Sequence, residues 1–276
     1  MSIRARDSFM ALFGKLRHEP IEKRVRAMLG DREVVDSTQA MLVWEPRRVV
    51  PSFAVPIADL RAELEPASAG PTSDAEVLHP RIPFAVHSTE GQSFDVRLNG
   101  QTLSGAAFRP DDPELNGHVI LDFDAFDTWY EEDEPLFSHP RDPFHRVDAR
   151  RSSRHVRIER DGRLLAESTE PTLVFETNLP VRFYLPRRDL QVEPGPSDRR
   201  SACPYKGHAS YLSFDVGEGK SADLAWSYED PVADARPLAG LVAFYDELVD
   251  VTVDGERRER PDTPFARALA EEFGLY

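Results

Sequence analysis

The residues with the greatest chemical capacity lie in one short segment, Cys203-Pro204-Tyr205-Lys206-Gly207-His208. It contains a thiol, a phenol, an amine and an imidazole, and its proline and glycine favour a turn, where side chains are held by the rigid elements on either side. We expect Lys206, Cys203 and Tyr205 to be the catalytic candidates, because an ammonium near a thiol favours the thiolate. The alternative is a buried structural cysteine beside a lysine that pairs with a carboxylate.

Two aromatic residues further along the chain suit the same site. Trp226 and Tyr228 are two residues apart in an expected strand, so they share one face. Such a pair can stack on a planar ligand while Lys206 meets its negative end. Glu176, at the end of another expected strand, is the expected partner of Lys206. The alternative is that this strand face is ordinary core.

A second polar pattern places His139, Asp142, His145 and Asp148 at intervals of three. Two intervening prolines prevent the helix that would align these side chains, and one cysteine in the whole chain excludes a site built from several thiolates. We therefore expect no metal site and no cofactor.

The composition limits the partners and the compartment. The 276 residues carry a net charge of −15, and such a surface repels phosphate backbones and anionic lipid. No apolar run is long enough to span a membrane, and the N-terminus lacks the features of a signal peptide. With a single cysteine, the sequence indicates a cytoplasmic protein without a nucleic-acid or membrane partner. It does not indicate an oligomeric state.

Strand periodicity surrounds the candidate residues. Apolar residues alternate with polar ones at 212–216, 224–228 and 249–253, and Asp161-Gly162 and Asp254-Gly255 are typical hairpin turns. Helices are few. The clearest is expected at 265–273, capped by Thr263, and weaker candidates are 124–130 and the extreme N-terminus.

The chain also reads as two copies of one unit. Residues 25–45 align without a gap to residues 156–176, and both segments contain Ser-Thr and end in an aromatic residue followed by Glu. Residues 93–96 and 213–216 both read Ser-Phe-Asp-Val, and further matches follow in the same order. We expect two tandem β domains, a degenerate copy with an N-terminal helical extension at 1–150 and a second copy at 151–276. The boundary is expected near Arg150–Ser153.

The motifs CPYKG, ESTEPTLVFET, RFYLPRRDL, LAWSYEDP and GLVAFYDELVDV resemble the bacterial family called domain of unknown function 427. The resemblance covers most of residues 155–254 and, in degenerate form, 24–144. It implies a mainly β fold of the β-tent or Mss4-like type, with antiparallel sheets and a few short helices, and it implies no function. The family pattern falls on Glu176, Tyr184, Cys203, Tyr205, Lys206, Gly207, Tyr211, Trp226 and Tyr228.

Because the first copy lacks the Cys and the Lys, we expect the second copy to hold the site. The leading hypothesis is a protein that binds or converts a small planar or anionic metabolite, and the residues do not decide between binding and catalysis. The alternative is a non-catalytic protein-interaction module built by duplication. The expected ligand-binding residues are Glu176, Tyr184, His208, Tyr211, Trp226 and Tyr228.

Overall fold

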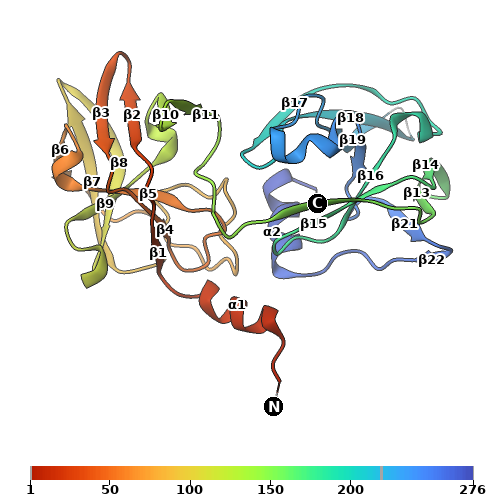
Figure 1. The fold of residues 1–276 in the computed structure, drawn as a ribbon, viewed down its shortest axis with the longest axis horizontal. Helices are drawn as coiled ribbons and strands as arrows, with labels where there is room; N and C mark the ends of the chain where they lie inside the picture. The colour runs from red at the N-terminus through yellow and green to blue at the C-terminus, as the bar shows by residue number, and fades with distance from the viewer. Residues whose placement is uncertain (1, 218–219, 276) are drawn as a thin grey trace. The chain divides into compact units, whose positions relative to one another are not determined.

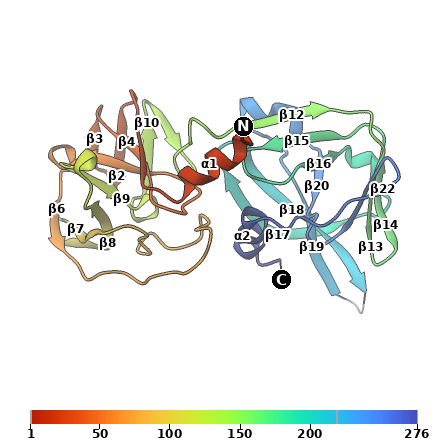
Figure 2. The same ribbon diagram turned by 90° about the horizontal axis from the view of Figure 1, so that it is seen from below.

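The computed structural model describes residues 2–217 and 220–275 of the chain, and it divides into two compact units, Met1–Asp142 and Pro143–Tyr276. Both units consist mainly of antiparallel strands with a few short helices (Figures 1 and 2), which confirms the expected fold class. No helix in the described residues has both the length and the hydropathy needed to cross a bilayer.

The first unit begins with a helix and continues as strands. Its elements are α1 (Ala5–Phe13), β1 (Arg17–Pro20), β2 (Val25–Leu29), β3 (Arg32–Ser37), β4 (Met41–Trp44), β5 (Ser52–Pro56), η1 (Ile57–Asp59), β6 (Glu63–Pro66), β7 (Gly91–Leu98), β8 (Gln101–Pro110), η2 (Pro113–Leu115), β9 (His118–Leu121), η3 (Phe123–Ala125), β10 (Thr128–Glu131) and β11 (Glu134–Leu136).

The second unit repeats this succession and ends with a helix. Its elements are β12 (Val147–Arg151), β13 (Val156–Arg160), β14 (Arg163–Ser168), β15 (Thr172–Glu176), β16 (Arg182–Leu185), η4 (Arg187–Asp189), β17 (Gly195–Cys203), β18 (Gly207–Gly217), β19 (Lys220–Ser227), η5 (Ala233–Leu238), β20 (Val242–Phe244), β21 (Asp250–Val253), β22 (Glu256–Arg257) and α2 (Pro264–Phe273).

The two units have the same sheet topology. The seven-stranded sheet of the first has the order β1-β4-β5-β9-β8-β7-β6, and that of the second has the order β12-β15-β16-β20-β19-β18-β17. The four-stranded sheets, β11-β10-β2-β3 and β22-β21-β13-β14, also match strand for strand. Each strand of the first unit therefore has a counterpart eleven labels later, and this correspondence lets residues of the two units be compared.

The boundary between the units lies earlier than Arg150–Ser153, where the sequence placed it. β12 belongs to the second unit because it pairs along its length with β15, from Val147 opposite Glu176 to Arg151 opposite Thr172. Residues 143–150 therefore belong to the second unit, and 147–151 form a strand of its large sheet.

The strand register also corrects one part of the repeat alignment. Phe94 pairs with Ala107, and Leu212 pairs with Ala225, so the counterpart of Phe94 is Leu212 and not Phe214. The identical Ser-Phe-Asp-Val segments are thus offset by two residues in the ladder. The error is hidden from a sequence comparison because a shift of two keeps every side chain on the same face.

The local signals at turns and helix ends were mostly correct. Both Asp-Gly hairpins have positive φ at each turn residue, and α2 begins where Thr263 Oγ1 accepts from Ala266 N at 3.1 Å and ends at the left-handed Gly274. The N-terminal helix is present as α1. The helix expected at 124–130 was wrong, because Phe123–Ala125 forms one 3-10 turn and Thr128–Glu131 pairs with β2 as a strand.

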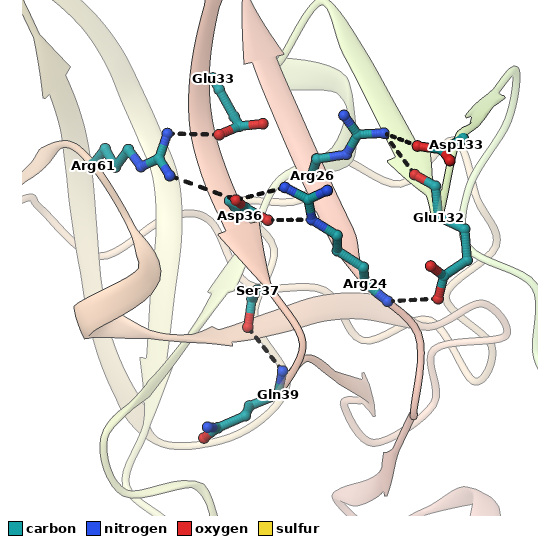
Figure 3. Close-up of polar contacts among 9 residues, drawn as sticks. All are labelled: Arg24, Arg26, Glu33, Asp36, Ser37, Gln39, Arg61, Glu132 and Asp133. Atoms are coloured by element: carbon teal, nitrogen blue, oxygen red, sulfur yellow. Dashed lines mark hydrogen bonds and ion pairs between the residues drawn. The ribbon is translucent and has the colours of Figure 1, made fainter.

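The outer face of the first unit's four-stranded sheet is covered by ion pairs (Figure 3). Arg24 donates to both carboxylate oxygens of Asp36 at 2.6 and 2.8 Å, and Arg61 Nη1 donates to Glu33 at 2.6 Å. Arg26 reaches the backbone oxygen of Glu132 at 2.7 Å in the turn between β10 and β11. These contacts identify a solvated charged face, and the acidic turn at 131–134 belongs to it.

The large sheet of the second unit has an apolar cluster on each face. Phe183, Phe214 and Phe244 belong to the cluster shared with the four-stranded sheet. The opposite cluster contains Tyr184 and Trp226 and packs against η5 and the end of α2. Phe214 and Phe244 are 5.4 Å apart between ring centroids. The candidate site lies on the Tyr184–Trp226 face.

Candidate functional site

The centre of the site is the buried carboxylate of Glu176. Its side chain is 6% exposed, and it receives the ammonium of Lys206 on one oxygen and the Nε2 of His145 on the other, the latter at 3.0 Å. The pairing of Glu176 with Lys206 is the contact that the sequence predicted. The histidine was not expected in this position.

Strand pairing explains how His145 reaches the carboxylate. Val147 lies opposite Glu176 at the start of β12, and Arg146 and Thr177 extend the ladder through a 3.0 Å bond from Thr177 N to Arg146 O. His145 thus enters immediately beside the end of β15. A sequence comparison cannot find this contact, because His145 and Glu176 are 31 residues apart and the counterpart of β12 in the first unit has a glycine, Gly14, at the matching place.

The CPYKG turn positions Lys206 between β17 and β18. Lys206 N donates to Cys203 O at 3.1 Å, and Val232 N donates to Lys206 O at 3.2 Å, which fixes the turn against the segment after β19. Gly207 has a φ of 106°, and a Cβ there would lie 3.3 Å from Pro231 Cα. Glycine is therefore required at position 207 for two reasons, the backbone conformation and the close approach of Pro231.

The electrostatics of the pair keep both partners charged. Burial alone would raise the pKa of the Glu176 carboxyl, but attraction to Lys206 and the hydrogen bond from His145 outweigh it and lower the pKa to about 2. Burial would lower the pKa of Lys206, yet attraction to Glu176 outweighs it and raises that pKa. Lys206 was expected to meet the negative end of a ligand, but in the structure its ammonium is bound to Glu176.

Cys203 lies at the end of β17 and is partly buried. Burial raises the pKa of its thiol, and this effect exceeds the opposing attraction to Lys206. Lysine and cysteine do converge as expected, but the thiol is protonated at neutral pH, so the expected thiolate is not favoured.

Tyr205 contributes an aromatic surface next to the histidine. Its ring is buried and stacks on the imidazole of His145, with centroids 4.2 Å apart and planes inclined by 25°. This contact restrains the plane of the imidazole. His208, two residues after Lys206, is exposed on β18.

The remaining predicted binding residues form the buried cluster on this face of the sheet. Trp226 Nε1 donates to the hydroxyl of Tyr184 at 3.1 Å, and the Trp226 ring packs against Tyr245 at 4.7 Å between centroids. Tyr228 shares the face with Trp226, as their spacing predicts. The hydroxyl of Tyr211 bonds to Ser201 Oγ at 2.8 Å. The rings of Trp226 and Tyr184 thus have protein neighbours, and Trp226 is 9% exposed.

A second buried group of charges adjoins this cluster. Arg182 on β16 donates to both carboxylate oxygens of Glu247 at 2.6 and 2.9 Å, lies 3.4 Å from Asp246, and is 5.9 Å from the Trp226 ring centroid. Burial outweighs the attraction of Arg182 and raises the pKa of Asp246 to about 6. Sequence reasoning missed this group. Its only signal was an Asp-Glu pair directly after an apolar strand.

The first unit has a related arrangement around Glu45, the counterpart of Glu176, in which the histidine is more deeply buried. Glu45 Oε2 accepts from His87 Nδ1 at 3.0 Å, and Arg48 Nε lies 3.7 Å away. The His87 side chain is 9% exposed, and its ring stacks on Phe108 at 3.6 Å between centroids. Its Nε2 is buried and has no hydrogen-bond partner among the residues that the structure describes. The first unit therefore also has a glutamate–histidine pair, which the sequence comparison did not reveal because the histidine comes from a different segment.

The histidine–aspartate pattern at 139–148 does not come together as one group. His145 binds Glu176, and Asp148 pairs with Arg146 and with Arg150, the latter at 2.7 Å. Within residues 2–217 and 220–275, no group of three or more His, Cys, Asp or Glu side chains is arranged to hold a metal ion.

Topology and site together define a β protein of two like-folded units with a charged, histidine-containing centre in the second. Residues 148–255 match the family model described as a domain of unknown function (DUF427), which supports the family resemblance for the second unit. The match includes Glu176 and the CPYKG turn and leaves out His145. No curated protein matches the chain.

Proposed function

We propose that the second unit binds a small planar or anionic metabolite where the CPYKG turn and the end of β15 meet. The observation that carries the proposal is the difference between two histidines bound to equivalent glutamates. The His145 side chain is 16% exposed, whereas that of His87 is 9% exposed and packed against Phe108. An oriented, partly exposed imidazole beside a fixed ion pair is suited to contact a ligand.

In this proposal the roles differ from those first expected. Lys206 holds Glu176 ionised, Glu176 orients His145, and the imidazole meets the ligand. Tyr205 supports the ring from one side. Trp226 and Tyr184 support the site as members of the buried cluster. They do not stack on the ligand, because they contact one another and the Trp226 ring also packs against Tyr245.

Exposing the purified protein to cell extract and identifying retained small molecules by mass spectrometry tests the proposal. The wild type and the His87→Asn variant should retain the same compound, and Lys206→Met should lose it. Asparagine is the matched control because its side-chain amide replaces the Nδ1 donor that His87 presents to Glu45. Retention of no compound by the wild type contradicts the proposal.

A second candidate function is a non-catalytic protein-interaction module. It is favoured by the burial of Tyr184, Tyr211, Trp226 and Tyr228, which act as core in the structure. Capture of a protein partner that Lys206→Met still binds, with no small molecule retained, would favour this candidate.

We further infer that the two units arose by duplication of one domain. The identical strand orders of both sheet pairs and the matching position of Glu45 and Glu176 support this origin. An experimental structure with different strand orders in the two units would contradict it. The single cysteine supports a reducing compartment such as the cytoplasm.

A further inference from the structure

The ring nitrogen of His145 that faces away from Glu176 is the atom of interest. An ionised carboxylate only accepts hydrogen bonds, so Nε2 of His145, 3.0 Å from Glu176 Oε1, carries the hydrogen. In the neutral imidazole the lone pair then lies on Nδ1. Among the described residues, the buried polar atoms without a hydrogen-bond partner include His87 Nε2 but not His145 Nδ1.

Two neighbours of this ring suit an imidazolium that forms by proton transfer to Nδ1. Glu176 is held ionised by Lys206, and a carboxylate bound to one imidazole nitrogen stabilises the imidazolium formed at the other. The face of Tyr205, 4.2 Å away, restrains the ring and offers an electron-rich surface to the cation.

We propose that His145 is the proton acceptor of the second unit's site, and that the ligand presents an O–H or N–H group to Nδ1. In the transfer, the O–H or N–H bond of the ligand breaks, its electron pair remains on the ligand atom, and a new N–H bond forms at Nδ1. The resulting imidazolium is paired with Glu176. This inference rests on the proposed function and specifies the class of ligand as protic.

The first unit provides the contrast that makes the inference testable. His87 binds its glutamate through Nδ1, so its free nitrogen is Nε2, and that atom is buried. Of the two histidines in the described residues that bind the equivalent glutamates Glu45 and Glu176, only His145 therefore presents an available lone pair. His87 is therefore an internal control in every experiment on the intact chain.

Acylation by diethyl pyrocarbonate measures the availability of the lone pair, since the reagent attacks an unprotonated imidazole nitrogen. Peptide mass spectrometry of the native wild-type chain should show His145 modified while His87 is spared. Glu176→Gln should slow the modification of His145 about tenfold, the rate equivalent of one charge-assisted hydrogen bond. Equal modification of the two histidines in the folded wild type, which requires no variant, overturns the inference.

Capture from extract separates this inference from the proposed function. His145→Gln keeps a donor at the position of Nε2 and removes the acceptor, so it should lose the compound that the wild type and His87→Asn retain. Unchanged retention by a folded His145→Gln variant overturns the proton-acceptor role alone. Failure of the wild type to retain any compound overturns the proposed function, whatever the acylation pattern.

Discussion

His145 donates through Nε2 to Glu176 at 3.0 Å, whereas the equivalent glutamate of the first unit, Glu45, is bound at the same distance through Nδ1 of His87. In both units an imidazole thus binds the glutamate, but through a different ring nitrogen in each. The histidines come from different segments, one before β12 and the other before β7. The glutamate at the end of the second strand of each large sheet is the shared feature.

The first prediction concerns the tautomers. In protein labelled with ¹⁵N-histidine, long-range correlation spectra at neutral pH should show His145 protonated on Nε2 and, where neutral, unprotonated on Nδ1. His87 should show the reverse pattern, because its Nδ1 faces the carboxylate. The same tautomer in both residues would mean that one of the two glutamate contacts is wrong.

The second prediction concerns the buried ion pair. Lys206→Met should destabilise the fold by roughly 3–5 kcal/mol, because it leaves the Glu176 carboxylate buried without its cation. Lys23→Met is the matched control, since Lys23 also pairs with a glutamate, Glu131, but its side chain is 48% exposed. The control should change stability by no more than about 0.5 kcal/mol.

Urea denaturation measures both variants. Adding Glu176→Gln to Lys206→Met should recover part of the lost stability, since it removes the unpaired charge. If Lys206→Met costs no more than Lys23→Met, the ion pair does not support the fold, and Lys206 is free to act on a ligand directly.

The sequence was sufficient for the architecture because the fold depends on local signals. The hairpin at Asp161-Gly162 and the Thr263 cap depend on residues that are close together in the sequence. The strands recur in the same order in both units. Lys206 was also correctly paired with Glu176, since this lysine and a glutamate at a strand end were the only charged members of the family pattern.

The rest of the site depended on contacts that no spacing encodes. His145 reaches Glu176 only through the pairing of β12 with β15, and Arg182 meets Glu247 from a strand 65 residues away. The aromatic residues were placed on the correct face, but their burial is decided by η5 and α2, which cover that face. Alternation predicts which residues share a side, and packing decides whether that side is open.

The third prediction concerns acid stability. The folded pKa of Glu176, about 2, lies below its ordinary value of 4.5, so its contribution is present above about pH 4.5 and is lost as pH falls toward 2. The contribution is on the order of 3 kcal/mol. Between about pH 4.5 and 2, the free energy of unfolding of Glu176→Gln should fall less than that of the wild type. Urea denaturation at a series of pH values measures both. Parallel curves for the two proteins would contradict the low pKa.

The fourth prediction concerns Asp246, whose pKa is shifted in the direction opposite to that of Glu176. Its pKa rises from 3.8 to about 6 in the folded protein, so the folded state binds the proton more tightly than the unfolded state. This group therefore favours folding at low pH, and that advantage is lost as pH rises from about 4 through about 6. Asp246→Asn keeps the shape, removes the titration and leaves Arg182 bound to Glu247.

Across that interval the stability of Asp246→Asn relative to the wild type should increase by on the order of 2–3 kcal/mol. Asp36→Asn is the control, because the hydrogen bond from Arg24 lowers the pKa of Asp36 below 3.8, so its stability relative to the wild type should fall as pH rises toward about 4 and stay level from pH 4 to 6. Urea denaturation at a series of pH values compares the three proteins. No increase in the relative stability of Asp246→Asn from pH 4 to 6 would show that attraction to Arg182 offsets the cost of burying the carboxylate.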